Sequence, residues 1–205
     1  MSTGSPVEFM LGPAPEDLAR ADIYAVLARF FYAPADPPLL DLMANSPPLE
    51  ADESTGEFAR AWAGLIAACA ATNENAAQDE FDALFVGVGK APISPYLGAW
   101  LPAAVSEHPL VDLRAFLLSQ GLARQQAVSE PEDHIAAVYE VMRHLILQPH
   151  ASMDAQREFF RHTIWPGVPR LCAALQANEH AQLFKAVARL ASAFAELENA
   201  AFEML

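Results

Sequence analysis

Residues 130–147 read EPEDHIAAVYEVMRHLIL, and this stretch indicates the fold class of the chain. From Ile135 onward the apolar residues recur at helical spacing, and those that share one stripe are Val138, Tyr139, Met142 and Ile146. A stripe of this kind has to be buried against other elements of the fold. We therefore expect a core helix over residues 131–147.

Charge is concentrated at the start of this helix. Ser129 and Glu132 have the spacing of a capping box, and Pro131 falls in the first turn, where its missing N–H costs nothing. Asp133 then lies near the positive end of the helix dipole. Because acidic first turns are common, simple capping also accounts for these residues, with His134 hydrogen-bonded to a neighbouring segment.

Helical patterns cover most of the remaining chain, and almost nothing alternates like a strand. Besides the helix over 131–147, the predicted helices run through residues 16–32, 38–44, 54–71, 76–85, 110–120, 154–162, 169–177 and 179–203. Two breaks interrupt them, at 87–102 and at 121–129.

These patterns predict an all-α fold. We expect a single helical bundle that could divide into an N-terminal lobe of residues 16–120 and a C-terminal lobe of residues 131–205, joined by a hinge at 121–130. Residues 1–15 are small and Pro-rich, and we expect them to be poorly ordered.

The composition limits the classes of partner. The chain has 205 residues and a formal net charge of −14, with 12 Lys and Arg against 26 Asp and Glu. This balance argues against a nucleic-acid partner and favours a cationic one, although excess carboxylates also simply maintain solubility. Cys69 and Cys172 lie within helical patterns, which indicates neither a disulfide framework nor a thiolate metal site. The chain has no secretory-signal pattern and no long apolar run, so we expect a cytoplasmic protein without stable membrane insertion.

The motifs of bond-making sites are weak or missing in the sequence. None of the six histidines has a glutamate three residues before it, as a di-iron helix bundle needs. The segment 87–90, Gly-Val-Gly-Lys, lacks the glycine spacing of a phosphate loop. Two histidines follow a glutamate by four residues, a spacing typical of surface hydrogen bonds and compatible with one-sided metal pairs. These pairs are Glu140–His144 and Glu158–His162.

Two groups of large apolar residues are candidates for a binding surface. Phe81, Leu84 and Phe85 have i, i+3, i+4 spacing, while Tyr96 and Trp100 lie in a loop rich in Pro and Gly. Aromatic residues in loops often anchor partners. The first group is also compatible with a place in the core, which is the more ordinary interpretation, and Trp100 with a place at the junction of two lobes.

Several of these segments together resemble the TorD/DmsD family of redox-enzyme maturation chaperones. They are Leu84-Phe85-Val86-Gly87, Pro95-Tyr96-Leu97-Gly98-Ala99-Trp100-Leu101, Leu113-Arg114-Ala115-Phe116, Gln120-Gly121-Leu122, Glu130-Pro131-Glu132-Asp133-His134, Phe159-Phe160-Arg161-His162 and Trp165. The resemblance covers the chain from about residue 21 to the last predicted helix, and the Glu-Pro-x-Asp-His element is its most specific part.

The resemblance implies an all-helical, non-enzymatic chaperone. We expect no cofactor and no metal site, although the sequence leaves open whether a nucleotide or the molybdenum cofactor also binds. Such a chaperone would bind the twin-arginine signal peptide and the apo form of a molybdenum-cofactor oxidoreductase in the cytoplasm until the cofactor is inserted, as a monomer or a domain-swapped dimer. A leader with two adjacent guanidinium groups and an apolar stretch needs carboxylates beside an apolar groove.

The resemblance also implies which residues bind the leader. These are Asp133, His134, Glu130, Pro131, Tyr96, Trp100, Phe81, Leu84 and Phe85. The chain departs from the family at Phe81, which is often tryptophan, at Gly98, which is often serine, and near Glu107, where glycine is usual.

Two other functions stay open on the residues alone. One is a metal-dependent hydrolase that uses Asp133 and His134. The other is a helical adaptor protein without a peptide pocket.

Overall fold

The computed structural model describes residues 13–50, 56–86, 91–102, 104–123, 130–148 and 152–204. Every regular element within these ranges is a helix, and their only β-type pairing is an isolated antiparallel bridge between Tyr96 and His134. The prediction of an all-α fold is therefore confirmed. No helix in this described part of the chain combines the length and the apolarity that a membrane crossing requires.

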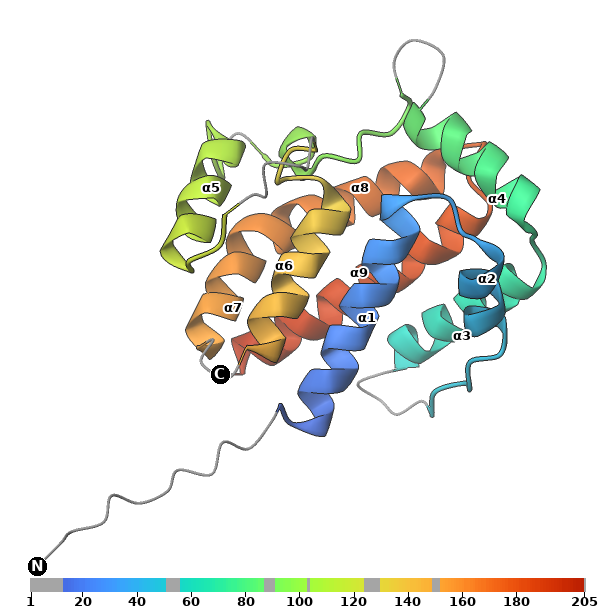
Figure 1. Cartoon of the computed structure of the whole chain (residues 1–205), viewed down its shortest axis with the longest axis horizontal. Coiled ribbons are helices and arrows are strands. Elements are labelled where there is room, and N and C mark those ends of the chain that lie inside the picture. Colours follow the sequence, from blue (N-terminus) through green and yellow to red (C-terminus); the bar gives the residue numbers. More distant parts are fainter. Residues whose placement is uncertain are drawn as a thin grey trace, which may run out of the picture.

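Figure 1 shows how the helices are arranged. In chain order they are α1 (Pro15–Tyr32), α2 (Pro37–Ala44), α3 (Gly56–Ala70), α4 (Glu74–Phe81), η1 (Asp82–Val86), η2 (Leu97–Ala99), α5 (Pro109–Ser119), α6 (Ile135–Leu147), α7 (Met153–Phe159), η3 (Phe160–Ile164), α8 (Trp165–Ala177) and α9 (Leu183–Glu203). The short elements η1 and η3 are π-helical, and η2 is a 3₁₀ turn.

The centre of the fold is formed by α1, which packs side by side with α6, and by α9, which runs behind them against α3 and α8 (Figure 1). The Tyr24 ring of α1 lies 4.8 Å from that of Phe194 on α9 and 5.7 Å from that of Tyr139 on α6, measured between ring centroids. One hydrophobic core contains residues from both halves of the chain. The division into two lobes stays a prediction, since residues 124–129 of the expected hinge lie outside the described residues, as do residues 1–12 of the N-terminal segment.

Two buried carboxylates connect segments distant in the sequence. Glu198 of α9 accepts hydrogen bonds from Arg20 Nε at 2.7 Å, from Arg20 Nη2 at 2.9 Å and from the Tyr24 hydroxyl at 3.1 Å. Glu80 of α4 accepts three backbone N–H groups at the start of α9. Because a buried carboxylate is costly without partners, these contacts explain how charged side chains persist in the core.

The sequence misplaced the starts of three helices by four residues each. The helix predicted over 131–147 begins at Ile135, so the prediction that Pro131 lies in its first turn and that Glu132 caps it is wrong. Ser129 of that capping box lies outside the described residues. The helix predicted from residue 169 begins at Trp165, with Pro166 in its first turn, and the helix predicted from residue 179 begins at Leu183.

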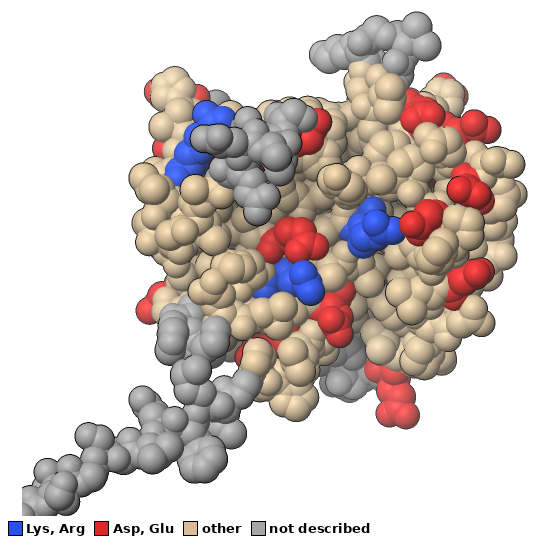
Figure 2. Space-filling view, viewed as in Figure 1, with Lys and Arg blue, Asp and Glu red and all other residues tan. Residues whose placement is uncertain are grey.

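The exposed carboxylates are not distributed evenly. Figure 2 shows Asp and Glu scattered over the visible face and most frequent along the edge formed by α2, α3 and α4. Much of the remaining visible face is uncharged.

Candidate functional site

The fold brings the loop before α5 next to the turn before α6. Leu97 N donates to the carbonyl oxygen of Asp133 at 2.8 Å, and Ile135 N donates to that of Pro95, also at 2.8 Å. These bonds flank the bridge between Tyr96 and His134. Two segments that the sequence marked separately thus form one structural unit.

Asp133 is oriented by this pairing. Its Oδ2 accepts the backbone N–H of Gly98 at 3.2 Å. A Cβ atom at Gly98 would lie only 2.8 Å from the same oxygen, which is closer than a real Cβ contact. Glycine at this position therefore permits the carboxylate to approach the backbone, and a serine would force it to shift.

His134 serves as the N-cap of α6. Its Nδ1 accepts the N–H of Ala136 at 3.3 Å, so the proton of the neutral ring is on Nε2. The ring is half-buried and meets the ring of Tyr96 edge-on, with 5.5 Å between centroids. Burial lowers the pKa of His134, against the raising effect of Glu130 and Asp133. The side chain is thus held as a neutral cap.

The remaining predicted residues of this unit are engaged in local contacts. The Tyr96 hydroxyl donates to Glu130 Oε2 at 2.7 Å, and this bond is the main reason that the pKa of Tyr96 is raised to about 12. Trp100 Nε1 donates to the carbonyl oxygen of Ser94 at 2.9 Å, and the Pro131 carbonyl accepts the N–H of His134 at 3.2 Å. These contacts fix the shape of the loop and the turn.

A bidentate ion pair joins the turn to α5. Arg114 Nε and Nη2 donate to the two carboxylate oxygens of Glu132 at 3.1 and 2.9 Å. Hydrogen bonding to Glu132 raises the pKa of Arg114. Because a fork-to-fork pair constrains orientation as well as distance, α5 is held at a defined angle beside the turn.

Phe81, Leu84 and Phe85 lie elsewhere, on α4 and η1, at the end of the molecule opposite α5 and α7 (Figure 1). Leu84 is fully buried, whereas Phe81 and Phe85 are partly exposed. The ring of Phe85 lies 4.9 Å from that of Phe184 and 5.0 Å from that of Phe81. Phe81 and Phe85 therefore pack against Phe184 of α9, and Leu84 lies in the core. The part of the three residues in leader binding stays a prediction.

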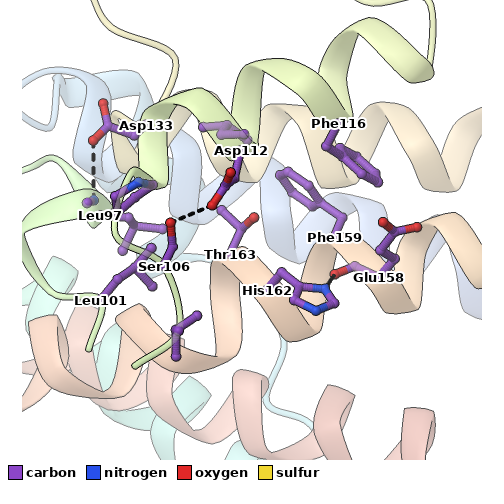
Figure 3. A pocket seen from close by; sticks show the side chains of 14 residues that line it. Leu97, Leu101, Ser106, Asp112, Phe116, Asp133, Glu158, Phe159, His162 and Thr163 are labelled. Atoms are coloured by element: carbon purple, nitrogen blue, oxygen red, sulfur yellow. Dashed lines mark hydrogen bonds between the residues drawn. The ribbon is translucent and has the colours of Figure 1, made fainter. Parts of the chain in front are cut away.

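A cavity of about 240 Å³ opens between η2, α5, the turn and the α7–η3 segment (Figure 3). Most of its wall is apolar, and the residues that form this part are Leu97, Leu101, Val105, Pro109, Leu113, Phe116 and Phe159. Phe116 of α5 stacks on Phe159 of α7, with 5.2 Å between ring centroids and 29° between ring planes. The cavity thus has a preformed aromatic wall.

The charged residues that line the cavity are acidic. Asp112, Asp133 and Glu158 contribute carboxylates, whereas no Lys or Arg is among the described residues that line it. Asp112 accepts a hydrogen bond from the Ser106 hydroxyl. Such a site can accommodate a ligand with an apolar body and a positive charge.

His162 completes this lining. Its Nδ1–H donates to the backbone carbonyl of Glu158 at 2.9 Å, which fixes the tautomer because a carbonyl oxygen can only accept. In the part of the chain that the structure describes, no group of three or more His, Cys, Asp or Glu side chains is placed to hold a metal ion.

Of the residues predicted to bind a leader, only Asp133 lines this cavity. Sequence reasoning missed Asp112 and Glu158, which come from two helices 46 residues apart. Glu158 was marked only as a partner of His162, and the only further signal was the match to the family at residues 113–116 and 159–162. No local pattern relates the two helices, because they meet only in the folded chain.

Comparison with known proteins gives two matches. The family model described as "Nitrate reductase delta subunit" matches residues 51–173. The "Chaperone protein TorD" of Photobacterium profundum is 24% identical over 132 residues, which are 59% of this chain and 61% of that protein. The chain therefore spans less than two thirds of the curated relative that it matches.

Proposed function

The chain belongs to the nitrate reductase delta subunit family, which includes TorD-like chaperones, and we propose that it is a chaperone for the maturation of a molybdenum-cofactor oxidoreductase. The resemblance to the TorD/DmsD family that the sequence indicated is confirmed by these matches. The family consists of chaperones rather than enzymes. In the proposed function the chain catalyses no reaction.

The proposed chaperone binds the twin-arginine leader of its client in the cavity beside Asp133. The observation that carries this proposal is an apolar cavity whose charged lining residues are all carboxylates. A leader of this class places two guanidinium groups next to an apolar stretch, so the cavity complements both parts. The net charge of −14 adds a long-range attraction for a cationic segment.

The residues of the paired loop and turn act in this proposal mainly by holding the cavity open. Asp133 faces the leader directly, while Glu130, Pro131, His134, Tyr96 and Trp100 fix the backbone around it. Phe81 and Phe85 offer a second, apolar contact at the other end of the molecule. The chaperone acts in the cytoplasm, before the client is exported.

Binding is reversible in this mechanism. The leader is disordered before capture, so part of the interaction free energy is spent on ordering it, and the affinity is moderate. Reversibility allows the mature client to pass to the export machinery.

Complex formation with a full-length client tests the proposal. The purified chain is mixed with the apo form of a molybdoenzyme encoded beside it, and size-exclusion chromatography detects the complex. We expect co-elution with the precursor, and weaker co-elution with a precursor that lacks its leader. A precursor with Arg-Arg changed to Lys-Lys measures how far guanidinium geometry contributes.

The second arm of the test is maturation in cells. Deletion of the chain should lower the activity of the client, and Asp133→Asn should restore less activity than the unchanged chain. If the chain binds no precursor and its deletion leaves the client fully active, the proposed function is wrong. If Asp133→Asn restores full maturation, a helical adaptor without a peptide pocket is favoured instead.

A further inference from the structure

We infer that Glu158 and Asp112 receive the arginine side chains of the bound peptide, and that these two residues determine its specificity. This inference rests on the proposed function, since it assigns residues within the same cavity. It differs from the expectation from sequence, which placed the acidic contacts on the turn at residues 130–134.

The three carboxylates of the cavity differ in how far they are already engaged. Asp133 accepts a backbone N–H through Oδ2, and Asp112 accepts the Ser106 hydroxyl through its Oδ2. The carboxylate of Glu158 makes no hydrogen bond or ion pair with any residue that the structure describes, and its side chain is exposed at the cavity. Glu158 therefore has both oxygens available for a bidentate guanidinium pair.

Among the described residues, no neighbouring cation forms an ion pair with the carboxylate of Glu158. Arg157, the preceding residue, pairs with Asp154 at 3.0 Å. His162 is hydrogen-bonded to the backbone carbonyl of Glu158 and not to its carboxylate. An unpaired carboxylate at the rim of an apolar cavity is a favourable site for a cation supplied by a partner.

The aromatic wall supports the same assignment. In Figure 3, Phe116 and Phe159 lie on the side of Glu158 and His162, whereas Asp133 lies beside Leu97 and Leu101. A planar guanidinium can stack on an aromatic face while it bonds a carboxylate, which an ammonium group does less well. The Glu158 end of the cavity thus favours arginine, whereas the Leu97–Leu101 end favours the apolar stretch, with the Asp133 carboxylate adding an attraction for the nearby positive charge.

Charge complementarity identifies the occupant as a cationic, apolar peptide segment. An apolar ligand alone would leave the negative charge of three carboxylates facing it uncompensated, and an anionic ligand would be repelled. Asp112 lies between the two ends in Figure 3. It is placed to receive the second of two adjacent arginines.

Calorimetric titration with synthetic leader peptides tests the assignment. The peptides carry Arg-Arg, Lys-Lys or Gln-Gln before the same apolar stretch, and the proteins are wild type, Asp112→Asn, Glu158→Gln and the double variant. Glu196→Gln is the matched control, since Glu196 is exposed on α9 and does not line the cavity. Thermal melting verifies that each variant is folded.

For the Arg-Arg peptide we expect Glu158→Gln to weaken binding about tenfold, because it removes a charge-assisted bidentate pair. Asp112→Asn should weaken it about threefold, since one of its oxygens is already engaged. Glu196→Gln should leave the affinity unchanged. Glu158→Gln should not change the affinity for the Gln-Gln peptide. For the Arg-Arg peptide, the affinity of the double variant should depend less on salt concentration than that of the wild type.

The outcomes separate this inference from the proposed function. If the wild type binds the Arg-Arg peptide and both single variants bind it equally well, the assignment is refuted and leader recognition stands. If Glu158→Gln weakens the Gln-Gln peptide as much as the Arg-Arg peptide, Glu158 has a structural role and the assignment is again refuted. If the wild type binds none of the peptides, leader recognition fails and this inference fails with it.

Discussion

Glu80 offers the sharpest test of how the fold is stabilised. Its Oε1 accepts the N–H groups of Gln182 and Phe184, each at 2.8 Å, and its Oε2 accepts that of Leu183 at 3.0 Å. The residue is only 9% exposed. It therefore caps α9 from another helix, in the place where the sequence predicted that α9 would extend back to residue 179.

The size of the effect of Glu80→Gln follows from these three bonds. The amide oxygen of glutamine can still accept two N–H groups, but its NH₂ group would face the third donor, so one buried N–H loses its partner. An unsatisfied buried donor costs about 1–3 kcal/mol, and loss of the negative charge at a helix N-terminus adds about 0.5–1 kcal/mol. We expect Glu80→Gln to lower the free energy of unfolding by about 2–3 kcal/mol.

Glu80→Ala should cost more, about 3–5 kcal/mol, because all three donors lose their partner and a cavity remains. For a chain of this length each kcal/mol lowers the midpoint of thermal unfolding by about 2–4 °C. Urea unfolding followed by circular dichroism measures both variants. Asp79→Asn, an exposed neighbour on α4, is the control and should change stability by less than about 0.5 kcal/mol. If Glu80→Gln proves as stable as the wild type, the cap contributes nothing and this account of α9 is wrong.

Three further predictions concern single residues. Tyr139 has a buried hydroxyl without a hydrogen-bond partner among the described residues. Tyr139→Phe should therefore raise the free energy of unfolding, measured in urea, by about 1 kcal/mol. A decrease of that size would mean that the hydroxyl has a partner. Burial lowers the pKa of His134, so the unfolded chain binds the proton of this ring more readily than the folded chain does. The contribution of His134 to the free energy of unfolding is therefore present above about pH 6.5 and is lost as the pH falls below that value. An NMR titration should place the pKa of this ring below those of exposed histidines, and a value at or above theirs would contradict the burial argument. Gly98→Ala should displace the Asp133 carboxylate, whose Oδ2 would lie 2.8 Å from the new Cβ, and cost about 1 kcal/mol through the lost backbone bond. An unchanged chemical shift of the Asp133 side-chain carboxyl carbon would show that the carboxylate has not moved.

The fold class could be predicted from periodicity because burial of apolar stripes is a local signal. The starts of α6 and α9 could not, since they depend on contacts with other parts of the chain. Glu80 decides where α9 begins, and it lies 103 residues before Leu183. Pairing with the loop at Tyr96 and Leu97 keeps residues 131–134 out of α6, although their composition is typical of a first helical turn.

The candidate site likewise combines residues that a local sequence signal reveals with residues that only the fold brings together. Asp133 could be found because it belongs to a short motif, whereas Asp112 and Glu158 lie on separate helices and only the fold places them at one cavity. The π-helical form of residues 160–164 was equally beyond sequence reasoning. Apolar periodicity does not distinguish a π-helical turn from an α-helical one.

The late start of α6 connects the fold with the proposed function. Because His134 is the cap and the residues before it pair with the loop, the Asp133 carboxylate is fixed by Gly98 N–H at the wall of the cavity. Holding the carboxylate in this orientation costs little free energy, since only one of its oxygens accepts a hydrogen bond and the residue remains partly exposed. A carboxylate placed in this way should matter more for binding a cationic peptide than for stability. We therefore expect Asp133→Asn to weaken an Arg-Arg leader severalfold in calorimetry while it changes the free energy of unfolding by less than about 1 kcal/mol. Loss of stability without loss of affinity would instead make Asp133 a structural residue of the turn.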